Sequence, residues 1–295
     1  MLRALWFSLA MLAAANCVSA AQVSSLASTQ HPTPTPTPKT AAGSSLAESS
    51  FHEDSAAENE LLQSANQDRK LADVPQLRMD DGLRTAALAH AQRMIAAQQL
   101  EHRFSGELPL LERIAEVSPL RMDRAGENLA AATCASSANE ALMRSPPHRA
   151  NLLDGNFNVV GIAAVWDEGR LYVVQDFGHQ LPTYSTQQSG QLVGGAVDEL
   201  RQQAGLSKLI QMTPPNLDAA ACKLASENRP NAHLLATAYD NRKIIAYTQS
   251  RPEALPQGAL RMLHDPGLRK FAVGSCYARN ATYPTGMYWV AILLY

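Results

Sequence analysis

The sequence lacks an excess of charge, and this absence narrows the classes of partner. The 295 residues carry 25 Lys and Arg against 27 Asp and Glu, for a formal net charge of −2. This balance, with no long basic run, supplies no positive field for nucleic acid or for an anionic membrane surface. The length fits one or two domains. Hydrophobic residues make up 46% of the chain, which is enough to build ordinary cores.

Long hydrophobic runs are also scarce, and the one that stands out lies at the N-terminus. An apolar segment from Ala4 to about Ala15 follows a single arginine, and the small residues Val18–Ala20 resemble a cleavage site. This pattern predicts a secretory signal peptide over residues 1–21. The run is too short to span a bilayer, and no later stretch comes close, so we expect no integral membrane span. The protein is then secreted or periplasmic, or alternatively an outer-membrane lipoprotein acylated at Cys17.

Residues 22–55 are rich in Ser, Ala and Thr and contain the repeat "HPTPTPTPK". Alternating Thr-Pro favours extended polyproline II and cannot build a core. We therefore expect a disordered tether between the signal peptide and the folded part of the chain.

Cysteines are few, with three beyond the predicted signal peptide: Cys134, Cys222 and Cys276. Export permits a disulfide. An odd count leaves one thiol free, and Cys134, in a predicted loop without basic neighbours, is the candidate for a free and unreactive thiol.

Helical patterns dominate the first folded segment. Apolar spacing predicts helices over about 57–69 and from "DDGLR" to about Leu100, the second capped by Asp80 or Asp81. A third helix is predicted in "SSANEALMR", begun by a capping box of Ser137 and Glu140. The prolines that follow stop this helix, since proline lacks an N–H and restricts the residue before it.

A β-hairpin follows in "NVVGIAAVWDEGRLYVVQDFG", with its turn at residues 167–170. Helices followed by a hairpin predict an α+β domain with layered α/β/α architecture over residues 56–183.

Three segments of this domain resemble a known family: "LLQSANQDRK", "EHRFSG…GENLA" and "SPPHRANLLDGNFNVVGIAAV…YVVQDFG". In this order they resemble the bacterial branch of the CAP superfamily, the SCP-like extracellular domains related to cysteine-rich secretory, antigen 5 and pathogenesis-related proteins. The resemblance implies an α/β/α sandwich with an open cavity, lined by His102, Glu127 and His148. Ser145 stands where many eukaryotic members have a second glutamate, and Leu142 stands where a tryptophan is usual.

The chemistry of these three side chains leaves two functional interpretations open. Two imidazoles and a carboxylate suit zinc or a similar divalent ion, with His102 and His148 as ligands. The same groups could transfer protons near neutral pH. No nucleophile of the elbow or triad type is present.

A structural interpretation competes with both. Glu127 would then hydrogen-bond backbone N–H groups, Asn128 would stabilise a turn, and His148 would tie the proline turn to Glu127. Arg149 would brace the carboxylate or pair with a nearby aspartate, Asp154 or Asp176. His90 is expected to be a core histidine with one partner, and Asp176 a structural hydrogen-bond acceptor.

Residues 190–295 align by hand with the first domain. Arg201 falls on Arg69, and "AAACKLA" falls on "AALAHA". We interpret this segment as a second, degenerate CAP-like copy. It has lost the site: no acid matches Glu127, and the place of His148 falls near Gly267 or Leu268. An unrelated α+β domain is the alternative.

Cys222 and Cys276 occupy the positions of Leu88 and Ala163, which are core candidates in the first copy. We therefore predict a Cys222–Cys276 disulfide that joins a helix to the sheet.

The resemblance does not decide the function, because a fold hosts many activities. The leading hypothesis is a secreted binding or interaction module for a lipid, a peptide or a cell-envelope component. The alternatives are a metal-dependent hydrolase, such as a protease, that uses His102, Glu127 and His148, and a purely structural surface protein.

Overall fold

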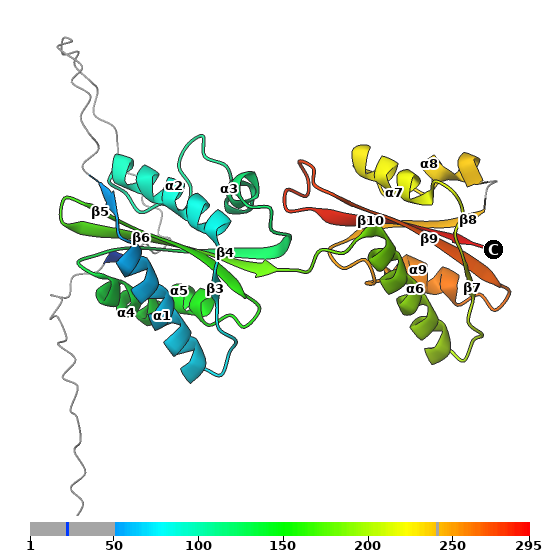
Figure 1. Cartoon of the computed structure of the whole chain (residues 1–295), viewed down its shortest axis with the longest axis horizontal. Coiled ribbons are helices and arrows are strands. Elements are labelled where there is room, and N and C mark those ends of the chain that lie inside the picture. The colour runs from blue at the N-terminus through cyan, green and yellow to red at the C-terminus, as the bar shows by residue number, and fades with distance from the viewer. Residues whose placement is uncertain (1–21, 24–50, 240–241) are drawn as a thin grey trace, which may run out of the picture.

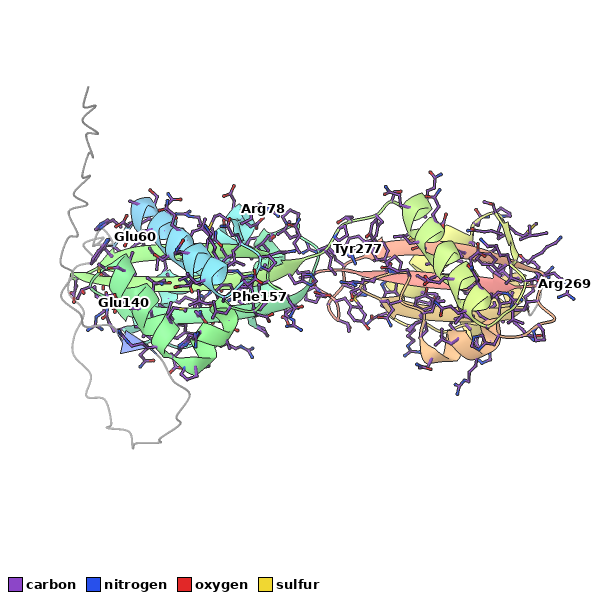
Figure 2. The ribbon with its side chains drawn as sticks, turned by 90° about the horizontal axis from the view of Figure 1, so that it is seen from below. Glu60, Arg78, Glu140, Phe157, Arg269 and Tyr277 are labelled. Atoms are coloured by element: carbon purple, nitrogen blue, oxygen red, sulfur yellow. A yellow bond between two sulfur atoms is a disulfide. The ribbon has the colours of Figure 1, made fainter. Side chains whose placement is uncertain are left out.

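The computed structural model describes residues 22–23, 51–239 and 242–295. The predicted signal peptide, Cys17 and most of the predicted tether lie outside these residues. Two folded units lie end to end (Figure 1), and Tyr277 of the second unit lies close to their junction (Figure 2). Among the described residues, no helix combines the length and the apolar character needed to cross a bilayer.

The first unit is built on a mixed sheet with the strand order β1-β4-β6-β5-β2, and β3 pairs in parallel with β5. The strands are β1 (Gln22–Val23), β2 (His52–Glu53), β3 (Arg78–Met79), β4 (Met122–Ala132), β5 (Val159–Asp167) and β6 (Arg170–Gln180). The long strands β4, β6 and β5 are antiparallel neighbours. They form the central layer of the unit.

Helices cover both faces of this sheet (Figure 1). Helices α2 (Asp81–Ala97) and α3 (Leu110–Val117) lie on one face. Helices α1 (Ser55–Leu71), α4 (Ala135–Arg144) and α5 (Pro146–Leu152) lie on the other. The predicted α/β/α sandwich is confirmed for this unit.

Each face has its own core. On the α1 side, side chains such as Leu61, Leu142 and Val160 are fully buried. On the α2 side, Met94 and Leu129 are fully buried. The sheet therefore buries both faces, as its nearly continuous apolar strands require.

Several sequence-based boundaries shift in the structure. The folded unit begins before residue 56, since His52 and Glu53 pair with β5 and Asp54 caps α1. Asp80 caps α2, as predicted. The predicted capping box of Ser137 and Glu140 is wrong, because α4 already begins at Ala135. The Ser137 hydroxyl instead donates to the Cys134 carbonyl oxygen.

The predicted hairpin is confirmed. Strands β5 and β6 are joined by Glu168 and Gly169, which have φ values of 46° and 77°. Two consecutive residues with positive φ form the tight turn that matches the twist of a hairpin. Strand β6 of this hairpin carries Asp176, which belongs to the site described below.

The second unit repeats this layering around a sheet with the strand order β7-β9-β10-β8. Its strands are β7 (Ile210–Met212), β8 (Lys243–Gln249), β9 (Lys270–Ala278) and β10 (Met287–Leu294). Its helices are α6 (Thr186–Gln203), α7 (Leu217–Ser226), α8 (His233–Ala236), the 3-10 turn Thr237–Tyr239 and α9 (Gln257–Leu263). Strand β7 runs parallel to β9, just as β3 runs parallel to β5.

Two buried arginines make matching contacts in the two units. Arg69 on α1 donates to the carbonyl oxygens of Leu152 and Asp154 at 2.8 and 3.0 Å. Arg201 on α6 donates to those of Leu263 and Asp265 at 2.6 and 3.1 Å. Each also donates from Nε to a carbonyl oxygen six residues further along the chain. These parallels support the repeat, which stays a prediction.

Direct contacts join the two units. Arg121, 2% exposed, places its guanidinium 4.6 Å from the ring centroid of Tyr288 in the second unit. The Thr285 hydroxyl donates to the Met122 carbonyl oxygen at 2.7 Å. Both contacts are buried, so the end of β4 and the β9–β10 loop meet in a packed junction.

The predicted Cys222–Cys276 disulfide is confirmed, and it joins α7 to β9. The prediction that Cys134 is a free thiol is wrong. Cys134 is disulfide-bonded, and no described cysteine is free.

Candidate functional site

His148 is positioned by the two prolines before it. Helix α4 ends at Arg144, and Ser145 serves both as its C-cap and as the N-cap of α5. Pro146 and Pro147 then begin α5, where a missing N–H costs nothing. His148 is 3% exposed, and its Nδ1 lies 2.8 Å from the Ser145 Oγ. The prolines therefore stop one helix and start the next, and His148 is tied to Ser145 rather than to Glu127.

Glu127 and Asn128 lie within strand β4 and not in a turn, which corrects the structural interpretation of "GEN". Their side chains point to opposite faces of the strand. Asn128 is fully buried and donates to the His148 carbonyl oxygen at 3.1 Å. Asn151 donates to the Glu127 carbonyl oxygen at 3.1 Å and to the Asn128 side-chain oxygen at 3.0 Å. These amides fasten α5 to β4 and so fix the place of His148.

The Glu127 carboxylate is held on both of its oxygens. The His102 Nδ1 lies 2.8 Å from Oε1. The Arg113 guanidinium donates to Oε2 in a short ion pair. The Glu127 side chain is 5% exposed, whereas that of His102 is 37% exposed. His102 therefore connects a buried ion pair to the surface.

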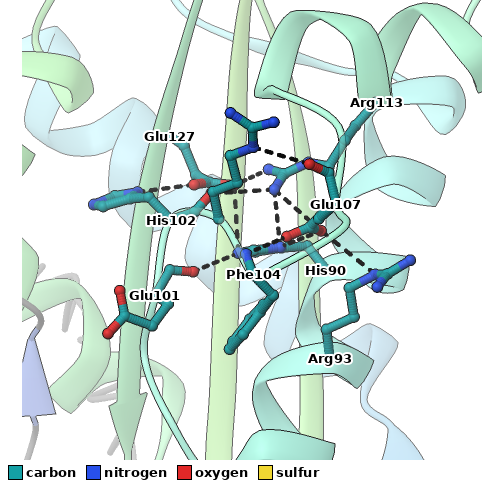
Figure 3. A network of polar contacts seen from close by, with 9 residues as sticks. His90, Arg93, Glu101, His102, Phe104, Glu107, Arg113 and Glu127 are labelled. Atoms are coloured by element: carbon teal, nitrogen blue, oxygen red, sulfur yellow. Dashed lines mark hydrogen bonds and ion pairs between the residues drawn. The ribbon is translucent and has the colours of Figure 1, made fainter.

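Arg113 also reaches a second acid beneath the site. Its Nη1 lies 3.2 Å from Glu107 Oε1 and 2.9 Å from His90 Nδ1. Figure 3 shows these side chains gathered with Arg113 between the two carboxylates. His90 Nδ1 lies 2.8 Å from Glu107, and its Nε2 lies 2.9 Å from the Glu101 carbonyl oxygen. His90 is thus a core histidine, but with several partners rather than one.

Neighbouring groups stabilise the negative charge of the Glu107 carboxylate. Burial alone would raise the pKa of its carboxyl group. The hydrogen bond from the Phe104 N–H and the contacts with His90 and Arg113 outweigh burial, so the pKa is lowered. Glu107 and Glu127 are therefore two buried carboxylates that share one guanidinium.

Asp176 is a further buried acid of this cluster, and it lies opposite Glu127 in the register of β4 and β6. It is fully buried, and neither carboxyl oxygen has a hydrogen-bond partner by distance and angle among the described residues. Burial, followed by the charge of Glu127, raises the pKa of Asp176 well above its ordinary value. This shift favours the neutral carboxylic acid beside the Glu127 carboxylate. The lack of a partner on either oxygen corrects the predicted role of Asp176 as a structural hydrogen-bond acceptor.

His148 is biased toward the neutral imidazole. Burial, and then the nearby charge of His102, lowers its pKa. With each Nδ1 bonded to Glu127 or Ser145, the Nε2 atoms of His102 and His148 have no hydrogen bond to the described protein. Neither Nε2 atom is therefore engaged by the described protein, and of the two imidazoles only that of His102 is substantially exposed.

Arg149 does not take part in the site. It is exposed on α5 and lines a shallow surface pocket with Met143 and Pro146. Arg113 holds Glu127 instead, and Arg124 pairs with Asp154 at 2.9 Å. The predicted bracing role of Arg149 is therefore wrong.

The arrangement does not fit a zinc site of three protein ligands. Among the described residues, no group of three or more His, Cys, Asp or Glu side chains is placed to hold a metal ion. Glu127, the expected third ligand, is paired with a guanidinium, which repels a second cation. Only the Nε2 atoms of His102 and His148 remain, and two nitrogens fall short of a stable zinc set.

Sequence reasoning missed Arg113 and Glu107. Both lie in the segment between the second predicted helix and "GEN", where α3 was not predicted. Helix α3 has eight residues, and Pro109 at its N-cap makes no side-chain cap. The signal that could have revealed them is the apolar pattern of "LLERIAEV", which leaves Arg113 beside the buried Ile114.

The second unit has alanines at the places that the predicted repeat would match to Glu127 and Asp176. Across the first sheet, Glu127 of β4 pairs with Asp176 of β6, which pairs with Gly161 of β5. Across the second sheet, Ala246 of β8 pairs with Ala291 of β10, which pairs with Gly274 of β9. Each of these glycines lies so close to a helix N-terminus that a Cβ would clash with its backbone. The second sheet therefore folds without the acid pair.

The contacts of the two arginines suggest a different match for His148 in the predicted repeat. Leu152 and Leu263 provide the carbonyl oxygens that Arg69 and Arg201 contact, and His148 and Ala259 stand four residues before them. This places the match at Ala259 on α9, whereas the sequence alignment placed it near Gly267 or Leu268, after α9.

Comparison with known proteins agrees with this description. Residues 62–177 match the family model described as "CAP: Cysteine-rich secretory protein family". A search of curated proteins finds no match to the chain.

A search of solved structures matches the chain to several proteins, including three that are only distantly related in sequence. An outer surface protein from Borrelia burgdorferi is 20% identical with a TM-score of 0.41, over 44% of this chain and 98% of that one. An extracellular protein with an SCP domain from Bacillus anthracis is 24% identical with a TM-score of 0.39, and the match covers 42% of this chain and 41% of that one. Na-ASP-1 is 8% identical with a TM-score of 0.46, and the match covers 81% of this chain and 89% of that one.

Proposed function

The first folded unit is a CAP domain, and from this premise we propose that the protein is an exported binding module that contacts its ligand through His102 and His148. The state of Glu127 supports this most. His102 and Arg113 engage its two oxygens, so this carboxylate acts as scaffold. A general base must come within reach of the proton that it takes, and here the carboxylate is paired on both oxygens and its side chain is only 5% exposed.

Both groups that we propose to face the ligand are imidazoles, and burial biases that of His148 toward its neutral form. The lowered pKa of His148 favours a nitrogen that accepts or donates a single hydrogen bond at neutral pH. Such groups suit the amides and hydroxyls of a peptide, a lipid headgroup or a cell-envelope component. Export rests on the predicted signal peptide at residues 1–21.

The alternative, a metal-dependent hydrolase, requires Glu127 to leave Arg113 and turn toward a metal held by the two histidines. This movement would leave the guanidinium, 8% exposed, without one of its two carboxylates, at a cost of several kcal/mol. The purely structural alternative predicts that replacing both histidines changes stability and nothing else.

NMR titration of the full-length protein separates these functions. The probes are phosphatidylglycerol vesicles, an alanine-rich peptide and cell-wall muropeptides, and the His102 and His148 imidazole signals are followed. We expect one probe class to shift both signals, and the His102→Ala/His148→Ala variant to lose that binding. Binding by the double variant with unchanged affinity, or no shift with any probe, would contradict the proposal. Cleavage of the peptide or muropeptide by wild type but not by Glu127→Gln would favour the hydrolase.

We also propose that the second unit is a degenerate copy of the CAP domain. The shared strand order, the matching contacts of Arg69 and Arg201, and the helix-facing glycines support this. With alanines at the matching positions of the acid pair and of His148, this copy serves as a packing partner or adhesive surface rather than as a second site.

A further inference from the structure

A separate cavity lies between α2 and α3, on the helical face of the first unit opposite α1. It encloses about 420 Å³. Neither His102 nor His148 lines it, so it is not the ligand-facing part of the candidate site. Arg93 and Ala89 of α2 and Arg113 and Val117 of α3 are among the residues that form its walls.

The polar lining of this cavity has more donors than acceptors to match them. Arg113 is 8% exposed, and its Nε has no hydrogen-bond partner among the described residues. The Arg93 side chain is 53% exposed and approaches only Glu107, at 3.6 Å, which is beyond hydrogen-bond distance. Glu107 already accepts on both oxygens, from His90 and from the Phe104 N–H. Two guanidinium groups are therefore left with N–H donors to spare.

Much of the remaining lining is apolar. Ala86 and Ala89 form the α2 side, and Leu108 and Val117 lie at the α3 side with exposures of 37% and 45%. Both are among the few large hydrophobic side chains that the described surface exposes. Glu116 also lines the cavity, but it is exposed, so water screens its charge.

We propose that this cavity binds a carboxylate on a short apolar body. The carboxylate meets Arg93 in front of the positively charged Arg113 guanidinium, and the apolar body covers Leu108 and Val117. A guanidinium is suited to this role because its planar N–H groups match a carboxylate. A free short-chain carboxylic acid and the C-terminal residue of a peptide both have this chemistry.

The test uses the full-length protein and NMR titration of the Leu and Val methyl groups. The probes are hexanoate for the free acid and N-acetyl-leucine for a peptide C-terminus, each beside its uncharged amide. We expect a carboxylate probe to shift the Leu108 and Val117 signals with a Kd of about 1 mM or lower, and the amides to bind at least about tenfold more weakly. The stronger of the two carboxylates identifies the source.

Two variants complete the test. Arg93→Gln, on an exposed side chain, weakens carboxylate binding about tenfold, whereas Arg170→Gln at the hairpin turn leaves it unchanged. Val117→Glu places a like charge on the apolar wall and abolishes binding. Equal binding of acid and amide, unchanged binding by Arg93→Gln, or no methyl shift up to about 10 mM probe would overturn the proposal. Because none of these readouts involves His102 or His148, they test this cavity independently of the proposed function.

Discussion

Replacing Asp176 with asparagine should stabilise the protein, by an amount that grows with pH. Asp176 is fully buried beside Glu127 and has no hydrogen-bond partner by geometry among the described residues. Burial and the charge of Glu127 raise its pKa in the folded state. The native state therefore keeps a proton that the unfolded chain releases above its ordinary pKa of about 3.9, so stability falls as pH rises between the two pKa values.

The slope follows directly from proton linkage. Within that window, wild type loses about 1.4 kcal/mol of unfolding free energy for each pH unit. The amide introduced by Asp176→Asn is neutral at every pH and keeps a donor beside Glu127, so the variant lacks this loss. The advantage of Asp176→Asn should begin to grow above about pH 4 and continue until the pH reaches the raised folded-state pKa. Each pH unit within this window adds about 1.4 kcal/mol, which corresponds to roughly 3–6 °C in Tm for the first unit.

Guanidinium unfolding and calorimetry at several pH values measure this difference. Because the two units can unfold separately, the transition of the first unit is the one to follow. Asp73→Asn is the matched control, since Asp73 is exposed in a left-handed conformation that asparagine tolerates; it should leave the pH dependence unchanged. A variant that is less stable than wild type at every pH, or an advantage that does not vary with pH, would refute the neutral carboxylic acid.

Three further predictions concern the site and its frame. Removing the guanidinium in Arg113→Ala leaves Glu127 and Glu107 buried without it and should cost about 3–5 kcal/mol in unfolding free energy; Arg149→Ala should change it by less than about 0.5 kcal/mol, and equal effects would contradict the assignment. The lowered pKa of His148 means that its contribution to stability is complete above about pH 6.5 and is lost as pH falls toward the folded pKa; His148→Gln should flatten this acid limb of the stability curve, and an unchanged limb would argue against it. Reducing the Cys222–Cys276 bridge should lower the unfolding free energy of the second unit by about 4 kcal/mol and move its denaturation midpoint accordingly, whereas a midpoint that does not move would show that packing alone holds α7 to β9.

The sequence predicted the identity of the site residues better than their contacts. His102, Glu127 and His148 are 25 and 21 positions apart, and no local spacing brings them together. The resemblance to the CAP family named them, and strand pairing and the amide contacts of Asn128 and Asn151 place them.

The failures have a common physical cause, which is that contacts across the fold are not encoded by closeness in sequence. Arg149 is next to His148, but neighbouring residues on a helix do not share a face, and Arg149 points to solvent. Arg113 reaches Glu127 from a short helix that no strong cap announces. Glu127 is the cross-strand neighbour of Asp176 because of the β4–β6 register, which the sequence of the β5–β6 hairpin does not specify.

Elements with strong local signals were predicted well. The Asp80 cap, the two-residue hairpin turn and the prolines after α4 each depend on the backbone chemistry of one or two residues. The disulfide was predicted by aligning Cys222 and Cys276 with two core positions of the first unit, and in the structure it joins α7 to β9. Cys134 was misassigned because counting cysteines requires knowing which part of the chain the mature protein keeps.

The central claim is that Arg113 locks Glu127, so that the site binds ligand through two imidazoles and without a metal. Calorimetric titration of the full-length protein with zinc tests it most directly, with wild type beside His102→Ala/His148→Ala. The account predicts no stoichiometric binding at micromolar zinc, and the same weak heats for both proteins. One equivalent of zinc bound with a micromolar Kd by wild type, and lost in the double variant, would contradict it, because the two histidines would then hold a metal despite the guanidinium beside Glu127.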